Sequence, residues 1–129
     1  MSGERYLLDT NAIVYLLRGG NTLQKQLQSA DWVGISILSY IEFLAFPNLS
    51  ENDRRIFQKF SEAIDIVSLD KTELALIDRV ITLRSQHRLK LPDAIIAATA
   101  IERDATLIAD DQQLRKLSAV KSAGTGLTG

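Results

Sequence analysis

The chain has 129 residues, 46% of them hydrophobic and 24% charged, and a formal net charge of −1, which is the composition of one ordinary globular domain. It has no cysteine and one histidine, so disulfides, thiolate metal sites, cysteine nucleophiles and paired imidazole catalysts are excluded. No apolar run could span a bilayer and no signal peptide is present, so we expect a cytoplasmic protein without a membrane partner, whose chemistry rests on carboxylates.

The first predicted elements are a buried strand over residues 6–8 and a helix over residues 12–17, joined by Asp9, Thr10 and Asn11. Asp9 is the only charged residue of this segment. It either caps the helix or lies at the carboxyl end of a strand, which is the edge at which α/β sheets bind ligands.

A helix over residues 22–30, a strand over residues 32–36 and a helix over residues 37–46 are predicted next. Glu42 is the only charge of the last helix. A buried carboxylate is costly unless it is paired, and no arginine lies within a helical turn of Glu42, so we interpret it as a functional residue. The stripe that we expect this helix to bury consists of Ile37, Ile41, Leu44 and Ala45.

Aromatic residues recur at threefold spacing on the opposite side of that helix, namely Tyr40, Phe43 and Phe46. A further helix opens at Ser50 with a sequence close to a capping box. Its large apolar residues are Ile56, Phe57 and Phe60. Either the two helices pack against each other here, or part of this surface meets a second subunit or another partner.

Residues 64–67 predict a third strand, and residues 70–73 resemble a capped start to a long helix. The end of that helix is followed by a basic cluster of Arg84, His87, Arg88 and Lys90. The cluster is either a solvated helix end, which the helix dipole favours, or a patch that steers phosphates.

Residues 91–101 are apolar or small except for Asp93 and Thr99, and they predict a helix that begins at Pro92, whose fixed φ suits a first helical position. A helix that is apolar nearly all round belongs in the interior. Asp93 either complements the dipole of this helix or holds a metal ion or a proton at the mouth of an α/β sheet.

A strand over residues 106–109 runs into Asp110 and Asp111, and a helix is predicted from about residue 112. Successive residues of an extended chain point to opposite sides, so we expect only one of the two acids to face a shared centre. Residues 120–121 predict a last short strand. We expect a domain over residues 1–121 and a flexible tail over the glycine-rich residues 122–129.

Isolated acids therefore recur at four points of an otherwise apolar sequence, namely Asp9, Glu42, Asp93 and the pair Asp110-Asp111. All except Glu42 lie at a predicted strand end or helix start. Clustered carboxylates repel one another unless they share protons or a cation, and Mg²⁺ and Mn²⁺ prefer oxygen ligands, which they bridge to substrate phosphates. The pattern favours hydrolysis of phosphodiester bonds by a metal-activated water.

Four segments carry a family resemblance and span nearly the whole chain: Leu8-Asp9-Thr10-Asn11, Ser39-Tyr40-Ile41-Glu42-Phe43, the run from Leu89 to Ala100, and Leu107-Ile108-Ala109-Asp110-Asp111. In these segments the chain resembles PIN domains, and in particular the small VapC-type toxins of bacterial toxin–antitoxin pairs. The resemblance implies a single PIN-like α/β domain, with a central parallel sheet of four to five strands and helices on both faces. It also implies a Mg²⁺- or Mn²⁺-dependent endoribonuclease that acts on RNA, forms a homodimer and is inhibited by a cognate antitoxin.

Aligned by the family pattern, the catalytic acids are Asp9, Glu42, Asp93 and Asp111, and the metal ligands among them are Asp9, Asp93 and Asp111. The residues that we expect to touch the substrate or support the acids are Thr10, Asn11, Asp110, Arg88 and Lys90, with Asp110 as a helix cap or supporting group. Family members often have Thr or Ser before the last acids and an Asp-Phe after them. This chain has Ala109 and Gln113-Leu114 at those places.

Other classes of α/β protein fit the sequence less well. A receiver domain needs adjacent acids after its first strand, and an aspartyl phosphotransferase needs Asp-x-Asp there, whereas this chain has Asp9-Thr10-Asn11. The remaining alternative is a catalytically inactive PIN scaffold that binds RNA or a protein partner. Metal-dependent cleavage of a mixed RNA pool would separate an enzyme from such a scaffold.

Overall fold

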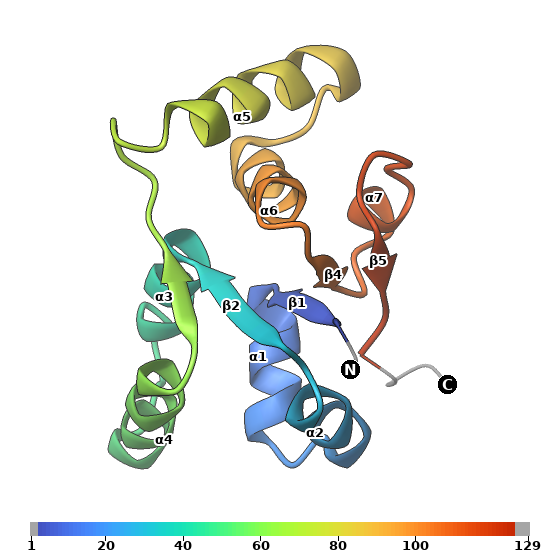
Figure 1. Cartoon of the computed structure of the whole chain (residues 1–129). Coiled ribbons are helices and arrows are strands. Elements are labelled where there is room, and N and C mark those ends of the chain that lie inside the picture. The colour runs from blue at the N-terminus through green and yellow to red at the C-terminus, as the bar shows by residue number, and fades with distance from the viewer. Residues whose placement is uncertain (1–2, 126–129) are drawn as a thin grey trace.

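A parallel sheet of five short strands forms the middle layer of the structure, a computed structural model that describes residues 3–125 (Figure 1). The strands lie in the order β3–β2–β1–β4–β5, and their bounds are β1 (Arg5–Leu8), β2 (Trp32–Ser36), β3 (Asp65–Val67), β4 (Thr106–Ile108) and β5 (Ser122–Ala123). Strand β1 is central, because Leu7 pairs with Gly34 of β2 on one side and with Leu107 of β4 on the other. The predicted parallel α/β sheet is confirmed.

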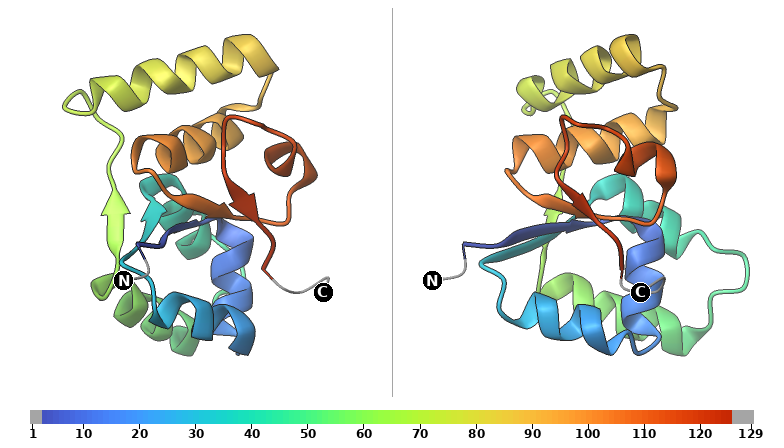
Figure 2. Two further views of the ribbon diagram at one scale, coloured as in Figure 1. Left: turned by 45° about the vertical axis from the view of Figure 1, so that its right-hand side comes forward. Right: turned by 90° about the vertical axis from the view of Figure 1, so that its right-hand side faces the viewer.

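Helices cover both faces of this sheet, as Figure 2 shows. The helices that share a core with one face are α1 (Thr10–Leu17), α2 (Asn21–Gln28), α3 (Ile37–Leu44) and α4 (Glu51–Glu62). The helices on the other face are α5 (Leu74–His87), α6 (Leu91–Glu102) and α7 (Gln112–Arg115). None of the helices in the described part of the chain is long and apolar enough to cross a membrane.

Strand β1 is apolar on both sides because both faces of the sheet are covered. The side chains of Tyr6 and Leu8 join the core shared with α1–α4, whereas Leu7 joins the core beneath α5 and α6. Leu7 and Leu8 are fully buried, so truncating either to alanine would cost about 2–5 kcal/mol. This anchored strand fixes the point at which Asp9 leaves the sheet.

Helix α6 is the interior helix that its composition predicts. Every residue from Ala94 to Ala100 is buried, and the helix lies between the sheet and α5 (Figure 2). The hydroxyl of Thr99 is accommodated by donating to the Ile95 carbonyl at 2.7 Å. The helix begins one residue earlier than expected, at Leu91, so that Pro92 occupies its second position.

The stripe predicted for α3 is wrong. Ile41 is 55% exposed and Ala45 is exposed, whereas Phe43 is buried. The Phe43 ring stacks on that of Phe57 in α4 at a centroid distance of 4.2 Å, and Tyr40 lies 5.5 Å from the same ring. Aromatic side chains bury more area than branched aliphatic ones, so the helix turns its aromatic side inward. The alternative in which α3 and α4 pack against each other is therefore confirmed for these rings.

The expectation of a tail from residue 122 is also wrong for the residues that the structure describes. Ser122–Ala123 form β5, paired with β4, and the backbone N–H of Ala109 donates to the carbonyl of Ala123 at 2.9 Å. The expected strand over residues 120–121 is thus displaced by two residues. Thr125 is only 3% exposed. Residues 126–129 lie outside the described residues.

The start of α5 differs from the predicted cap. Asp70 accepts from the backbone N–H and the hydroxyl of Thr72, and these bonds hold a turn and lower the pKa of Asp70. The helix itself begins four residues later at Leu74. It buries one stripe of apolar residues against α6 and leaves Leu74 and Ile81 exposed on its outer side.

Candidate active site

The acids gather at the carboxyl edge of the sheet, beside its topological switch point. From β1 the chain proceeds outward to β2 and β3, whereas β4 and β5 lie on the other side of β1. Such a reversal leaves a crevice outside the strand ends, which is where open α/β sheets bind ligands. A cavity of about 260 Å³ lies there, lined by Asp9, Thr10, Asn11, Glu42, Phe46, Pro92, Asp93, Ile96, Asp111 and Leu114.

Asp9 leaves the end of β1 and caps α1. Its Oδ1 accepts from the Ala12 N–H at 2.8 Å, and the residue is only 6% exposed. Burial raises the pKa of this carboxyl to about 6, and the nearby charges of Asp110, Asp111 and Glu42 act in the same direction. The capping bond from Ala12 opposes them. Asp9 is therefore both a helix cap and a member of an acidic cluster in which its ionised form is disfavoured.

Glu42 reaches the cavity from the second turn of α3, and its partner is Thr10. The Thr10 hydroxyl donates to Glu42 Oε1 at 2.6 Å, which joins the start of α1 to α3. A short bond to a carboxylate is among the stronger hydrogen bonds in proteins. No arginine is needed to hold Glu42, which explains why the sequence offers none nearby.

Asp93 lies in the first turn of α6 and accepts no side-chain hydrogen bond from a described residue. Partial burial raises its pKa, and the charges of Asp111 and Glu42 add to this. The positive charge of Lys90 acts in the opposite direction. The carboxylate of Asp93 is thus available to a ligand in the cavity.

Asp110 and Asp111 diverge, as expected for neighbours on an extended chain. Asp111 lines the cavity and caps α7, its Oδ1 accepting from the backbone N–H groups of Gln113 at 2.8 Å and Leu114 at 3.4 Å. Asp110 does not line the cavity and is bound by Thr125, whose backbone N–H and hydroxyl donate to its two carboxylate oxygens at 3.0 and 2.8 Å. We expected Asp110 to be a cap or a supporting group, but the cap is Asp111.

The other expected site residues divide into two groups. Thr10 and Asn11 line the cavity, whereas Arg88 and Lys90 lie outside it in the turn before α6. The sequence pattern did not predict Thr125, because a lone threonine near glycines carries no signal of its long-range partner. It also missed the apolar wall of the cavity, whose members Phe46, Ile96 and Leu114 resemble ordinary core residues in sequence.

The chemistry of the cavity suits a hard divalent cation, since its charged groups are all carboxylates. Within residues 3–125, no three His, Asp or Glu side chains stand close enough together to hold an ion as they now lie. Asp111 is engaged in capping and Glu42 in its bond to Thr10, whereas Asp93 accepts no such bond. The donor types therefore fit Mg²⁺ or Mn²⁺, and binding would require small movements of these side chains.

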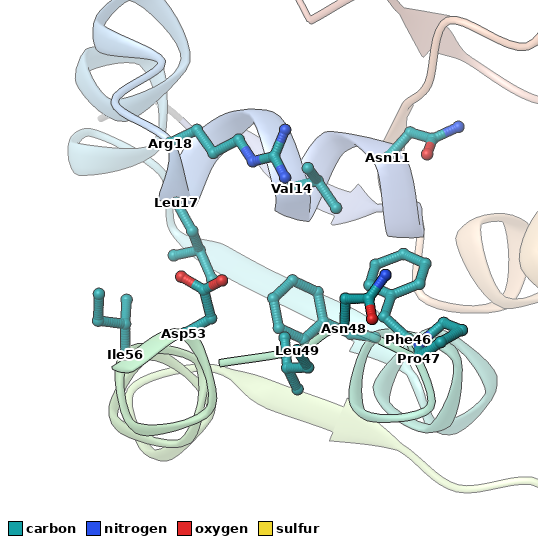
Figure 3. A pocket seen from close by; sticks show the side chains of 11 residues that line it. Asn11, Val14, Leu17, Arg18, Phe46, Pro47, Asn48, Leu49, Asp53 and Ile56 are labelled. Carbon is teal, nitrogen blue, oxygen red and sulfur yellow. The ribbon is translucent and has the colours of Figure 1, made fainter. Parts of the chain in front are cut away.

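A second hollow begins beside the acidic cavity and shares Asn11 and Phe46 with it (Figure 3). It has a volume of about 360 Å³ and lies between α1 and the segment that links α3 to α4. A third hollow of about 620 Å³ shares Leu17 and Ile56 with the second and extends to Trp32 at the amino end of β2. We call the second and third hollows together the α1–α4 groove.

The fold and the acidic cavity define a class of protein. The sequence matches the model of the PIN domain family over residues 6–120, and the chain belongs to this family. A comparison with curated protein sequences gives no match.

Solved structures of similar fold include chains from toxin–antitoxin complexes. A toxin–antitoxin complex from Klebsiella pneumoniae contains a chain that is 25% identical, with a TM-score of 0.72, over 89% of this chain and 94% of that one. A chain of VapBC2 from Rickettsia felis, bound to a DNA fragment from its promoter, is 18% identical, with a TM-score of 0.75, over 93% of this chain and 98% of that one. A chain of VapBC-1 from nontypeable Haemophilus influenzae is 21% identical, with a TM-score of 0.70, over 94% of this chain and 98% of that one.

Proposed function

We propose that this protein is a VapC-type toxin, a Mg²⁺- or Mn²⁺-dependent endoribonuclease that hydrolyses phosphodiester bonds of RNA in the cytoplasm. The observation that carries the proposal is the convergence of Asp9, Glu42, Asp93 and Asp111 on one cavity at the switch point of a PIN domain. These acids come from four different helices: Asp9 and Asp111 are N-caps, Asp93 lies in a first turn and Glu42 in a second turn. Structural needs such as capping explain Asp9 and Asp111 singly but do not explain why all four meet.

In this proposal Asp9, Asp93 and Asp111 hold the ion, and Glu42 acts on the reacting water or phosphate. When bound, the cation supplies positive charge that neutralises the phosphate and makes water acidic enough to attack at neutral pH. Thr10 fixes the rotamer of Glu42 through the 2.6 Å bond. Asn11 is the neutral donor at the rim, where it lines both the cavity and the α1–α4 groove.

The raised pKa of Asp9 supports the need for a cation. A buried carboxyl with three acidic neighbours retains its proton up to about pH 6 when nothing else compensates its charge. A divalent cation compensates the same charge without a proton. The cluster is therefore poised to exchange protons for metal near neutral pH.

We further propose that a cognate antitoxin occupies the α1–α4 groove. The groove exposes Phe46 and Ile56 (Figure 3), and exposed apolar side chains grouped in a hollow commonly mark an interaction site. The groove shares Asn11 and Phe46 with the acidic cavity. Several proteins of the same fold are described in toxin–antitoxin complexes. The exposed side of α5, with Leu74 and Ile81, is the surface that we assign to a second copy in a homodimer.

The test of the activity is cleavage of a mixed RNA pool by the purified full chain. We expect products with Mg²⁺ or Mn²⁺, none in excess EDTA, and at least a hundredfold loss in Asp93→Asn. The matched control is Asp78→Asn, an exposed acid of α5 whose replacement should change nothing. RNA binding without any metal-dependent cleavage would establish the alternative, an inactive PIN scaffold, in place of the enzyme.

A further inference from the structure

The turn between α5 and α6 carries an excess of positive charge in a protein whose net charge is −1. Residues 84–92 include four basic side chains and no acid, and we call this surface the α5–α6 corner; its basic members are Arg84, His87, Arg88 and Lys90. All four are exposed, and none forms a salt bridge with a described residue. Nearby cations behave differently, since Arg79 pairs with Glu102 and Arg103 pairs with Glu73.

Two hydrogen bonds and one left-handed residue define the backbone of the corner. Arg88 ends α5 with a φ of 55°, a left-handed geometry that residues other than glycine seldom adopt. Its N–H donates to the Arg84 carbonyl at 3.0 Å, and Arg84 Nε donates to the Leu89 carbonyl at 3.2 Å. These contacts position the backbone from which the basic side chains project. The side chains of Arg88 and Lys90 are exposed to solvent.

The corner lies next to the acidic cavity. Lys90 is the residue before α6, and Asp93, which lines the cavity, is in the first turn of that helix. The charge of Lys90 is close enough to lower the pKa of Asp93 against the effect of burial. The turn between α5 and α6 also lies over the same edge of the sheet as the starts of α1 and α3 (Figure 2).

Among the described residues, no lysine, arginine or histidine lines the cavity. A polyanion would be repelled by the four carboxylates unless fixed cations outside the cavity hold it. The unpaired cations of the α5–α6 corner are placed to do this. Arg and Lys side chains are the usual partners of nucleic-acid phosphates.

We propose that the α5–α6 corner binds the backbone of single-stranded RNA beside the cleavage site, with Arg88 and Lys90 each contacting a phosphate. This proposal rests on the proposed function, because it places the RNA relative to the acids that would cut it. It gives Arg88 and Lys90 a role in binding substrate and none in the chemical step.

The experiment measures binding and cleavage separately. Binding of a labelled mixed-sequence single-stranded RNA to the full chain is measured in EDTA, where no cleavage is expected, over a range of salt concentrations. The variant is Arg88→Gln with Lys90→Gln, and the control is Lys25→Gln with Lys59→Gln, which removes the same charge from exposed positions on α2 and α4. Neither Arg88 nor Lys90 donates a side-chain hydrogen bond to a described residue, so the variant should fold.

We expect the variant to bind RNA about 25-fold more weakly than the wild type at 0.1 M salt. Its slope of log Kd against log salt should be smaller by about 1.4, which corresponds to two lost phosphate contacts on a single strand. The control should match the wild type in slope. In the presence of metal, the KM of the variant should rise. Because Lys90 also lowers the pKa of Asp93, kcat is compared in the single variant Arg88→Gln, whose kcat should stay unchanged while its KM rises.

Equal weakening in the variant and the control, no weakening in either, or a wild type that binds no RNA would overturn the proposal. A kcat that falls with KM unchanged would also contradict it. If the wild type binds RNA through this corner but cleaves none, the RNA-binding role of the corner is supported and the proposed nuclease activity is contradicted. If the wild type cleaves RNA and the variant binds and cleaves it equally well, the nuclease activity is supported and the RNA-binding role of the corner is contradicted.

Discussion

At the scale of single residues, the site depends on carboxylates that each do two things. Asp9 caps α1 and faces the cavity, and Asp111 caps α7 and faces the same cavity. A cap uses only one carboxylate oxygen, so the second remains available to a ligand. A helix cap can therefore also place a carboxylate at the edge of the sheet. A capping role of Asp9 or Asp111 does not argue against a functional role.

The raised pKa of Asp9 predicts a pH-dependent effect of Asp9→Asn on stability. The folded protein holds the Asp9 proton up to about pH 6, whereas the unfolded chain releases it near the ordinary aspartate pKa of 3.8. The stability of the wild type therefore falls as the pH rises through this interval, and the cost is complete above about pH 6. In EDTA at pH 7, Asp9→Asn should raise the free energy of unfolding by up to about 3 kcal/mol, since the amide oxygen can still cap α1.

Urea denaturation between pH 4 and pH 8 checks this prediction. The gain should shrink to well under about 1 kcal/mol at pH 4, where Asp9 is protonated in the folded protein and only partly ionised in the unfolded chain. A gain of the same size at every pH would mean that Asp9 is not titrating in this interval. The matched variant Asp78→Asn, at an exposed position on α5, should show no such trend.

Thr10 gives a second prediction at this scale. Thr10→Val keeps the shape of the side chain and removes the donor that holds Glu42. We expect metal-dependent cleavage to fall about 10- to 100-fold, the usual cost of losing a group that orients a site residue. Thr10→Ser restores the hydroxyl and should recover most of the rate. Equal rates for Val and Ser would show that the Thr10–Glu42 bond has no part in catalysis.

At the scale of elements, the sequence predicted best where one pattern dominates a segment. The apolar run of α6 and the strand-then-acid pattern after β1 each point to one structure, and both are present. The orientation of α3 could not be predicted, because both of its sides are apolar and the choice is made by Phe57 of another helix. The partner of Asp110 could not be predicted either, because Thr125 meets it through the pairing of β5 with β4.

That pairing supplies a prediction about the end of the sheet. Thr125→Val removes the hydroxyl that donates to the half-buried carboxylate of Asp110. We expect a loss of about 1–3 kcal/mol in the free energy of unfolding. The amide of Ala109, which bonds to Ala123 in β5, should exchange with solvent faster than in the wild type. Unchanged exchange at Ala109 would show that Thr125 does not secure β5.

At the scale of the whole molecule, two exposed apolar surfaces lie on opposite sides of the sheet. The α1–α4 groove is formed by helices of one face, and the outer side of α5 belongs to the other (Figure 2). Under the proposed function, the antitoxin and a second copy would each have a surface of their own. The two surfaces can therefore be disabled one at a time.

The matched variants are Ile56→Asp in the groove and Ile81→Asp on α5, each an exposed isoleucine. Ile81→Asp should convert a homodimer to a monomer in sedimentation experiments, and Ile56→Asp should leave the dimer intact. In cells, the cognate antitoxin should relieve the toxicity of Ile81→Asp, if any remains, but not that of Ile56→Asp. The reverse pattern would mean that the two surfaces have been assigned to the wrong partners.

The central position of β1 has a consequence for how such a protein is made. Tyr6 pairs with Val33 on one side but must wait for Thr106 on the other, so one edge of the first strand stays open until most of the chain has been translated. The acidic cavity likewise draws on Asp9 and Asp111, which are synthesised at opposite ends of the chain. A nascent or prematurely terminated fragment can carry three of the four acids and still have no cavity. Under the proposed function, this order of assembly keeps the site that would cut RNA incomplete until the chain is nearly complete.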